Sequence, residues 1–339
     1  MAAPAPPAPA RAQGLRVAVA GAAGALGREV IGVLAERRFP VAELLPFGSE
    51  RSLGRDVEFG DEVLAVEAQA PPLRGLDLLI LCTPRSPALD LVREALRAEV
   101  ACIDCSGALV RTQQVAIALA DRTPAEKIVA APLLVAPAGP ALAWARALAA
   151  FDDVVGLERA RGTVLQSAAM AGEAGIEALS QETIALLAQR ETPPRSVFPT
   201  EVAFDCVPTP GVPDIEQEIA VVLGSVLGRV LPLSAQVVQA PTFTGEGSAL
   251  ALEVARDLEA EPLLAALGKA PGVRRWESQT DRLPGPSTRD AAGSDDVLLG
   301  TVRRDAASER GWLAWIAADP IRLAAVNAVK LAETRLCLH

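Results

Sequence analysis

Three glycines near the start of the chain have the spacing of a phosphate-binding turn. They follow a short apolar run at residues 16–20 and precede an amphipathic segment, Arg28–Arg37. A buried strand, a glycine turn and a helix in this order begin a dinucleotide-binding unit, because glycine lets the backbone approach a pyrophosphate and the helix N-terminus attracts its charge. The alternative is an ordinary βα turn that is rich in glycine and alanine. The predicted cofactor-binding residues of the turn are Gly21, Gly24, Ala25, Leu26 and Gly27.

A second polar turn follows the next predicted strand, Leu44–Phe47. It contains Ser49, Arg51 and Ser52, where many dinucleotide-binding domains carry an acidic residue for the ribose 2′-hydroxyl. An arginine beside small hydroxyl residues suits a 2′-phosphate through charge-assisted hydrogen bonds. Glu50 argues slightly against this interpretation, and a solvated polar loop is the alternative. These residues favour NADP over NAD as the cofactor.

One pair of cysteines, Cys102 and Cys105, forms a C-x-x-C motif. As a metal half-site it lacks a second pair, and the sole histidine of the chain is the last residue, His339. As a redox pair it lacks a thioredoxin-like setting. We therefore expect neither metal binding nor redox use of this pair, and we expect Cys102 to point into a core. The five cysteines of the chain are scattered and odd in number, which favours a reducing, cytoplasmic compartment.

The elements around these residues alternate between strand and helix up to about residue 127. A buried strand is predicted at Leu76–Leu81, a helix at Pro87–Arg97 and a further strand at Ala101–Ile103. The alternation predicts an α/β fold that begins with an N-terminal doubly wound Rossmann domain. Ligands of such a domain lie at the carboxyl ends of its parallel strands.

Beyond residue 127 the pattern changes to strands and helices separated by polar loops. A strand is predicted at Ile128–Ala131, and a loop at 192–213. A long helix is predicted within Ala168–Gln189, beginning near Gly172 and Gly175. The pattern predicts a C-terminal α+β mixed-sheet domain, and a last helix, Ile321–Leu336, is expected to return to the first domain. The sequence predicts a disordered tail over residues 1–14. A nucleotide-binding domain is predicted over 15–131 together with the helix at 320–339. A substrate and dimerisation domain is predicted over 132–319.

Composition limits the kind of partner. The net charge is −10 with no stripe of lysine or arginine, which argues against nucleic acid. No apolar run reaches the roughly 18 residues of a membrane span, so we expect no membrane partner. Half of the 339 residues are hydrophobic, enough to build the cores of two domains.

From residue 15 onward the chain resembles the aspartate-semialdehyde dehydrogenases. The resemblance implies an NADP-binding Rossmann domain followed by a domain for chemistry and homodimerisation. It also adds Thr83, Ser106 and Asn327 to the expected cofactor site. The matching segments are Gly21–Gly27, Ser49–Gly54, Asp104–Ala108, Gln166–Leu179, Pro241–Gly245, Asp290–Gly300 and Asp319–Val329.

The resemblance also implies a mechanism, from which the chain departs. In the family a cysteine thiolate attacks the aldehyde, hydride passes to NADP⁺, and phosphate releases the acyl group. The family's Asn-Pro-Asn-Cys segment is matched to the residues ending at Leu134, which places leucine where the thiol should be. Glu246 stands at the position of the histidine base and Gln239 at that of the substrate-binding arginine. In the family an arginine and a lysine bind on the phosphate side, and their positions are occupied here by Val110 and Glu218.

Of the family's reaction centre only Gln166 and Ser106 remain. Cys105 is the one stand-in thiol, although it has no histidine to activate it. Glu246 is expected to be a solvated loop residue, with an altered base as the alternative. Joint loss of nucleophile, base and substrate cations predicts lost dehydrogenase activity, as in catalytically inactive paralogues that the chain resembles. The alternatives are an active NADP-dependent oxidoreductase with altered residues and a structural partner of an active homologue.

Met170 stands where the family brings glycine close to the nicotinamide. We therefore expect weak NADP binding, mainly through Arg51. Together with Leu133, Leu134 and Val135, Met170 predicts an apolar pocket that accepts a doubly charged substrate poorly. A small-molecule ligand in this emptied pocket and a homodimer or homo-oligomer are the expected partners.

Overall fold

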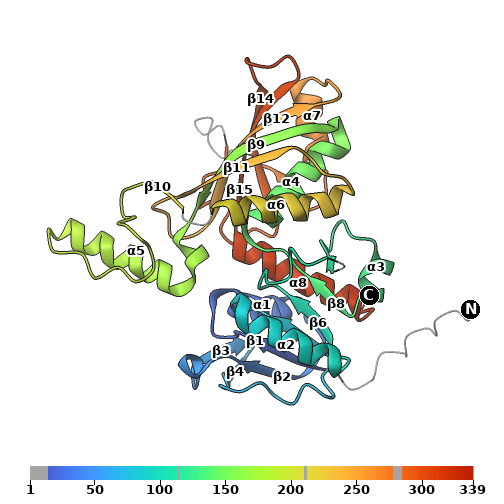
Figure 1. Ribbon diagram of the computed structural model, residues 1–339, viewed down its shortest axis with the longest axis vertical. Helices are drawn as coiled ribbons and strands as arrows, with labels where there is room; N and C mark the ends of the chain where they lie inside the picture. The colour runs from blue at the N-terminus through green and yellow to red at the C-terminus, as the bar shows by residue number, and fades with distance from the viewer. Residues whose placement is uncertain (1–13, 114, 210–211, 278–284, 339) are drawn as a thin grey trace, which may run out of the picture.

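The computed structural model describes residues 14–113, 115–209, 212–277 and 285–338. Apart from Gly14, the tail expected over residues 1–14 lies outside this part of the chain. The described chain forms two domains stacked along its long axis, each built on its own sheet (Figure 1).

The first domain contains a parallel sheet of six strands in the order β2-β1-β5-β6-β8-β7. A short hairpin, β3-β4, follows β2. The strands are β1 Leu15–Ala20, β2 Val41–Phe47, β3 Asp56–Phe59, β4 Glu62–Ala65, β5 Leu78–Leu81, β6 Ala101–Asp104, β7 Ala116–Ile117 and β8 Leu133–Val135. The helices are α1 Ala25–Glu36, η1 Glu50–Ser52, α2 Arg85–Arg97, α3 Ala125–Ala130 and α8 Pro320–Arg335.

Both faces of this sheet are covered, which explains the continuous apolar runs of its central strands. Val17 and Val19 of β1 pack with α1 and α8 on one face. Ala18 and Ala20 pack with α2 on the other face. The doubly wound Rossmann domain predicted from the sequence is therefore confirmed.

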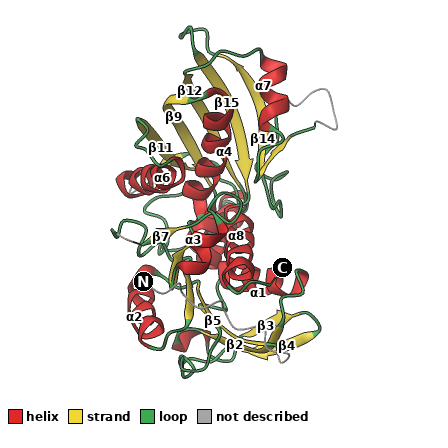
Figure 2. Cartoon of the chain, turned by 90° about the vertical axis from the view of Figure 1, so that its right-hand side faces the viewer, coloured by secondary structure: helices red, strands yellow, loops and turns green. Residues whose placement is uncertain are grey.

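The second domain contains a mixed sheet of seven strands in the order β10-β11-β9-β12-β15-β14-β13. Helix α4 lies against this sheet and also reaches α8, so that it spans from one domain toward the other (Figure 2). The strands are β9 Leu157–Gln166, β10 Val207–Pro208, β11 Leu233–Gln239, β12 Glu246–Val254, β13 Val273–Arg275, β14 Val297–Arg304 and β15 Gly311–Ala318. The helices are α4 Gly139–Val155, η2 Ala168–Ala171, α5 Gly172–Leu187, α6 Val212–Leu227 and α7 Ala260–Leu267.

One expectation about an individual element is wrong. Residues Ile128–Ala131 do not form a strand, because they complete helix α3, whose Glu126 and Lys127 suit the two ends of the helix dipole. Strand β8, just beyond the expected domain bound at Ala131, pairs with β6 and β7 in the first sheet. The long helix expected to begin near Gly172 is present: Ala168–Ala171 form the tight turn η2, and α5 runs on from Gly172, whose φ of +73° separates the two.

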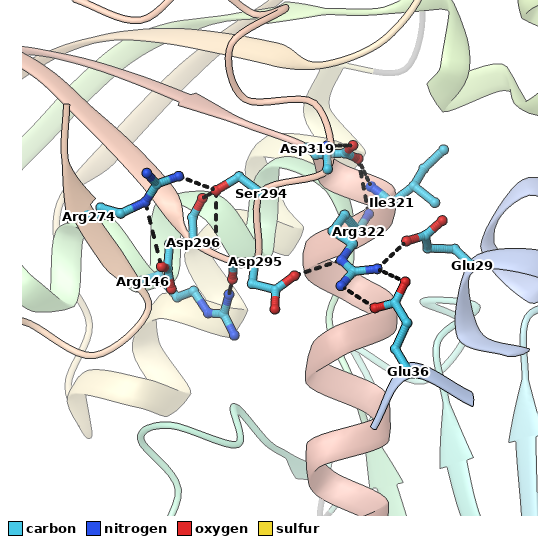
Figure 3. A network of polar contacts seen from close by, with 11 residues as sticks. Glu29, Glu36, Arg146, Arg274, Ser294, Asp295, Asp296, Asp319, Ile321 and Arg322 are labelled. Atoms are coloured by element: carbon cyan, nitrogen blue, oxygen red, sulfur yellow. Dashed lines mark hydrogen bonds and ion pairs between the residues drawn. The ribbon is translucent and has the colours of Figure 1, made fainter. Parts of the chain in front are cut away.

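Arg322 on α8 joins the two domains by ion pairs (Figure 3). Its Nη1 lies 2.9 Å from Oε1 of Glu29, and its Nη2 lies 2.6 Å from Oε2 of Glu36, both on α1. Its Nε lies 2.6 Å from Oδ1 of Asp295, in the loop before β14 of the second domain. The start of α8 is thereby held against both domains.

Candidate functional site

The glycine turn between β1 and α1 is packed too closely for side chains at two of its glycines. A Cβ on Gly21, whose φ is +73°, would lie 2.5 Å from the carbonyl oxygen of Cys82. A Cβ on Gly27 would lie 2.2 Å from the carbonyl oxygen of Gly21. At Gly24 the nearest atom would be 3.3 Å away, so glycine there leaves the approach to α1 open rather than relieving a clash.

The residues around this turn fit a dinucleotide. No side chain caps the N-terminus of α1, so the first backbone N–H groups of the helix are available to an anion. At the carboxyl end of β5, Oγ1 of Thr83 is buried without a hydrogen-bond partner. An unsatisfied buried hydroxyl beside an uncapped helix end is the arrangement that a bound pyrophosphate and ribose would complete.

The polar turn predicted to hold the 2′-phosphate lies next to the glycine turn. The backbone N–H groups of Gly21 and Ala22 donate to the carbonyl oxygen of Phe47, at 2.8 and 3.2 Å, directly before this turn. Ser49 precedes η1, which includes Arg51 and Ser52. Arg51 is exposed and makes no hydrogen bond or ion pair with the described residues. Its guanidinium is therefore free to bind a ligand.

Two residues expected at the cofactor are instead used by the fold. Asn327 is fully buried; its Oδ1 accepts from the N–H of Ala120 at 2.9 Å, and its Nδ2 donates to the carbonyl oxygen of Ala118 at 3.2 Å. Ser106 donates to Oδ1 of Asp104 at 2.5 Å and accepts from the N–H of Ala108 at 3.0 Å. Asn327 therefore ties α8 to the loop at 118–120, and Ser106 shapes its own turn.

Three polar side chains form a row across neighbouring strands of the second sheet. Gln239 of β11 pairs in register with Gln166 of β9, and Gly247 of β12 pairs with Leu165, which brings Glu246 opposite Gln166. Nε2 of Gln239 donates to the carbonyl oxygens of Gln166 and Ala240 at 3.0 and 3.1 Å. Oε1 of Gln166 is buried without a partner. The row therefore places three polar side chains side by side on adjacent strands, among them Gln166 with an unused acceptor.

Glu246 is not the solvated loop residue that we expected. It begins β12, is 1% exposed, and neither carboxylate oxygen has a hydrogen-bond partner among the described residues. Burial, with a smaller contribution from the charge of Asp319, raises its pKa to about 8. Glu246 is therefore mostly protonated at neutral pH.

A cavity of about 260 Å³ opens beside Gln166 and Gln239. Its wall is completed by Ala171 of η2, Thr209 and the apolar loop 197–202. None of the described residues that line it carries a charge. Oγ1 of Thr209 is buried without a partner, so the cavity offers neutral hydrogen-bonding groups on an apolar wall.

The structure does not bring Leu134 to this cavity. Leu134 lies in β8, 1% exposed, in register with Ile103 and Ala116 of the neighbouring strands. The expectation that it faces the substrate pocket is wrong because the strand points it into the core of the first domain. The residue that meets Met170 is Gly139, the first residue of α4, since a Cβ on Gly139 would lie 2.9 Å from Cε of Met170.

The stand-in thiol Cys105 follows β6 directly, at the carboxyl edge of the sheet as expected. It is 4% exposed, and a hydrogen bond with the thiol of Cys82, together with burial, raises its pKa well above the usual range. A thiol in this state is a poor nucleophile. Cys102 points into the core as predicted, with 2% exposure.

Two features of the described residues limit what the site can hold. The described residues contain no group of three histidine, cysteine, aspartate or glutamate side chains arranged to hold a metal ion. In the same part of the chain, every helix is too short or too polar to cross a membrane.

Fold and site together define a two-domain protein of the Rossmann, NAD(P)-binding type. Residues 16–131 match the semialdehyde dehydrogenase NAD-binding domain, and residues 148–323 match the semialdehyde dehydrogenase dimerisation domain. The chain therefore belongs to the semialdehyde dehydrogenase family.

The relatives are similar over nearly their whole length. An aspartate-semialdehyde dehydrogenase of Aquifex aeolicus is 29% identical over 333 residues, covering 94% of this chain and 97% of the relative. A USG-1 protein homolog of Azotobacter vinelandii is 30% identical over 328 residues, covering 94% and 96%. The crystal structure of aspartate semialdehyde dehydrogenase II from Vibrio cholerae, complexed with ASA, superposes with a TM-score of 0.87 at 27% identity, covering 95% of this chain and 98% of that one.

Proposed function

We propose that this chain is a nucleotide-binding member of the family that does not carry out the thiol-dependent dehydrogenase reaction. The observation that carries the proposal is which side chains stand at the end of β9, the start of β12 and the start of α4. Gln166 and Glu246 come from paired strands, and Met170 contacts Gly139 at the start of α4; none of these four positions carries a cysteine or histidine. The family reaction needs a thiolate and an imidazole, so its two central groups are missing.

The position of the lost nucleophile follows from the contact of Met170. The family's Asn-Pro-Asn-Cys segment fits Ala136-Pro137-Ala138-Gly139 at its proline, five residues after the match that ends at Leu134. Only the second match places its last residue at the N-terminus of α4, beside Met170. We infer that Gly139 stands where the thiol would be. Glycine offers no nucleophilic atom, and the thioether of Met170 reaches the space beside it.

The neighbouring cavity supports the loss of the usual substrate. A carboxylate buried in a pocket needs a cation or several donors. Gln239 replaces the expected arginine, and its amide is already bonded to the backbone. A neutral ligand with one hydrogen-bond donor for Oε1 of Gln166 suits this cavity better than a charged semialdehyde.

The nucleotide-binding residues support retained NADP binding. The uncapped start of α1 would receive the pyrophosphate, Thr83 would bond to the sugar or phosphate, and Arg51 would pair with the 2′-phosphate. When bound, NADP⁺ would supply a hydride acceptor, but no thiol stands at Gly139 to form the thiohemiacetal from which the hydride would come.

A titration of NADP⁺ and NAD⁺ by isothermal calorimetry tests the binding part. We expect weak binding of NADP⁺, weaker binding of NAD⁺, and a loss of about tenfold for NADP⁺ alone in Arg51→Ala. The control is Arg97→Ala, an exposed arginine at the end of α2 that lies outside the site. Absence of heat with both nucleotides would leave only a structural partner of an active homologue.

A coupled assay tests the catalytic part. Aspartate semialdehyde, phosphate and NADP⁺ are mixed with the protein, and NADPH is followed by absorbance. We expect no formation above a blank without protein. Turnover at rates ordinary for enzymes, on the order of 1 per second or more, contradicts the proposal and favours altered chemistry at Glu246 or Cys105.

We also propose a homodimer formed through the second domain. One face of its sheet is covered by α4, α6 and α7, whereas Arg161 of β9 and Ala249 of β12 lie exposed on the other. Helix α5 extends away from the body (Figure 1), with Ile184 and Leu187 exposed by 56% and 73%. Light scattering coupled to size exclusion should show a dimer that Ile184→Asp with Leu187→Asp weakens. Val230→Asp, at a loop position that is 90% exposed, should not weaken it.

A further inference from the structure

A second cavity, which we call the basic pocket, lies where the two domains meet. It measures about 250 Å³ and lies between the edge of the first sheet, at Ile117 and Leu134, and the end of α6, at Ser225. It shares no lining residue with the cavity beside Gln166. Its charged residues are Arg122 and Lys127, so both of its charges are positive.

Arg122 has an unsatisfied edge. Its side chain is 12% exposed, and its Nη1 lies 2.5 Å from Oδ2 of Asp153. Its Nε and Nη2 are buried without a hydrogen-bond partner among the described residues. These two nitrogens form one edge of the guanidinium plane, the edge that binds two oxygens of a carboxylate or phosphate side by side. A buried charged donor left empty is costly, so this edge calls for an anion.

Other residues that can donate hydrogen bonds line the same pocket. The ammonium group of Lys127 makes no ion pair within the described part of the chain, although the protein carries a net charge of −10. Oγ1 of Thr123 accepts the N–H of Leu119 at 3.0 Å, which leaves its own hydrogen for a ligand. Ser225 adds a second hydroxyl from the other domain. Two cations and two hydroxyls match a doubly charged group with several acceptor oxygens.

We propose that the basic pocket binds a small phosphate-bearing ligand, either inorganic phosphate or a short phosphate monoester. A tetrahedral dianion can meet the ammonium of Lys127, a hydroxyl and, once the guanidinium turns toward the pocket, the free edge of Arg122; a planar carboxylate cannot meet all three at once. The volume is below that of a typical drug-sized site, so the rest of the ligand is small. Because Arg122 and Ser225 belong to different domains, the bound ligand holds the domains together.

Calorimetric and thermal-shift titrations with inorganic phosphate and with glycerol 3-phosphate test the proposal, at constant ionic strength set with chloride. We expect saturable binding, and Lys127→Ala should weaken it about tenfold. Arg122→Lys keeps a charge for Asp153 but removes the paired edge, and it should weaken binding at least as much. Lys269→Ala, at an exposed lysine on the second domain, is the control and should bind as the unchanged protein does.

The alternatives give distinct outcomes. Tighter binding of one of the two phosphate compounds than of the other supports the proposal. It also shows whether the pocket prefers free phosphate or a phosphate monoester. Equal affinities in the unchanged protein, Lys127→Ala and Arg122→Lys overturn it. Phosphate binding that is lost in Arg51→Ala and kept in Lys127→Ala assigns the anion to the glycine turn instead. Succinate binding as tightly as phosphate contradicts the preference for a tetrahedral group.

Discussion

Cε of Met170 lies 2.9 Å from the point where a Cβ atom on Gly139 would stand. Gly139 also has a φ of +58°, in the left-handed region that residues other than glycine avoid. Two independent conditions therefore favour glycine at the N-terminus of α4. The start of this helix is closed by a thioether and lacks room for a side chain that could react.

The substitution Gly139→Ala should destabilise the fold by about 1–2 kcal/mol, because the backbone conformation remains strained. Adding Met170→Ala should recover only the steric part, since the end of a methionine side chain can move aside. Urea unfolding of the two variants measures the difference. The control is Gly224→Ala inside α6, where a Cβ would meet its nearest atom at 3.6 Å. That control should be neutral or stabilising by up to about 1 kcal/mol.

Burial of Glu246 makes stability depend on pH. Its pKa is raised from 4.5 in a free carboxyl to about 8 in the fold. Between these values the folded chain holds a proton that the unfolded chain has released, so this group makes stability fall as pH rises from about 5 to 8. Glu246→Gln keeps the shape of the protonated side chain and removes the titration. The variant should match the unchanged protein at pH 5 and exceed it by a few kcal/mol, in order of magnitude, at pH 8.

Thermal unfolding of both proteins across this pH range provides the measurement. Glu58→Gln, on the exposed side of β3, is the control and should leave the pH profile unchanged. An identical slope in Glu246→Gln and in the unchanged protein would show that Glu246 is ionised in the fold and has an anion-stabilising partner.

Cysteine reactivity should follow burial rather than position in the sheet. Cys206 and Cys337 are exposed, whereas Cys102 and Cys105 are buried with raised pKa values. Brief treatment with iodoacetamide at neutral pH should modify the exposed pair at least about a hundred times faster than the buried pair. Peptide mass spectrometry gives the rates, and modification in denaturant should remove the difference. Rapid labelling of Cys105 in the folded protein would revive its role as a nucleophile.

The sequence was sufficient for the parts of the fold that repeat a strong local pattern. The apolar run at residues 16–20, its glycines and the helix after them predict the Rossmann start, because each step is local. Helix α3 was missed because its six residues are too few for a helical period to appear beside an apolar Ile128. The secondary structure of such short segments depends on the neighbouring strands rather than on a local pattern.

The errors at the site have a different cause. Two Ala-Pro pairs five residues apart fit the family's segment equally well, and our proposal of the second pair depends on the packing of Met170 on Gly139. Glu246 looked like a loop residue because glycines flank it. Its burial results from pairing with β15 and from its place on the α4 face of the sheet, and both depend on segments far away in the chain.

The ion pairs of Arg322 should stabilise the junction of the two domains. Its side chain is 16% exposed and contacts Glu29, Glu36 and Asp295 (Figure 3). Arg322→Ala leaves three carboxylates facing one another without a cation, so the loss should exceed that of an ordinary surface pair.

We expect Arg322→Ala to lower the free energy of unfolding by about 2 kcal/mol, because its partners are partly exposed and screened by solvent. Added salt should reduce this difference, since it screens the repulsion among the remaining carboxylates. Arg93→Ala is the matched control: its ion pair with Asp90 on α2 is exposed at both ends and should contribute little. Equal stability of the two variants in low salt would show that α8 is held to both domains by apolar packing alone.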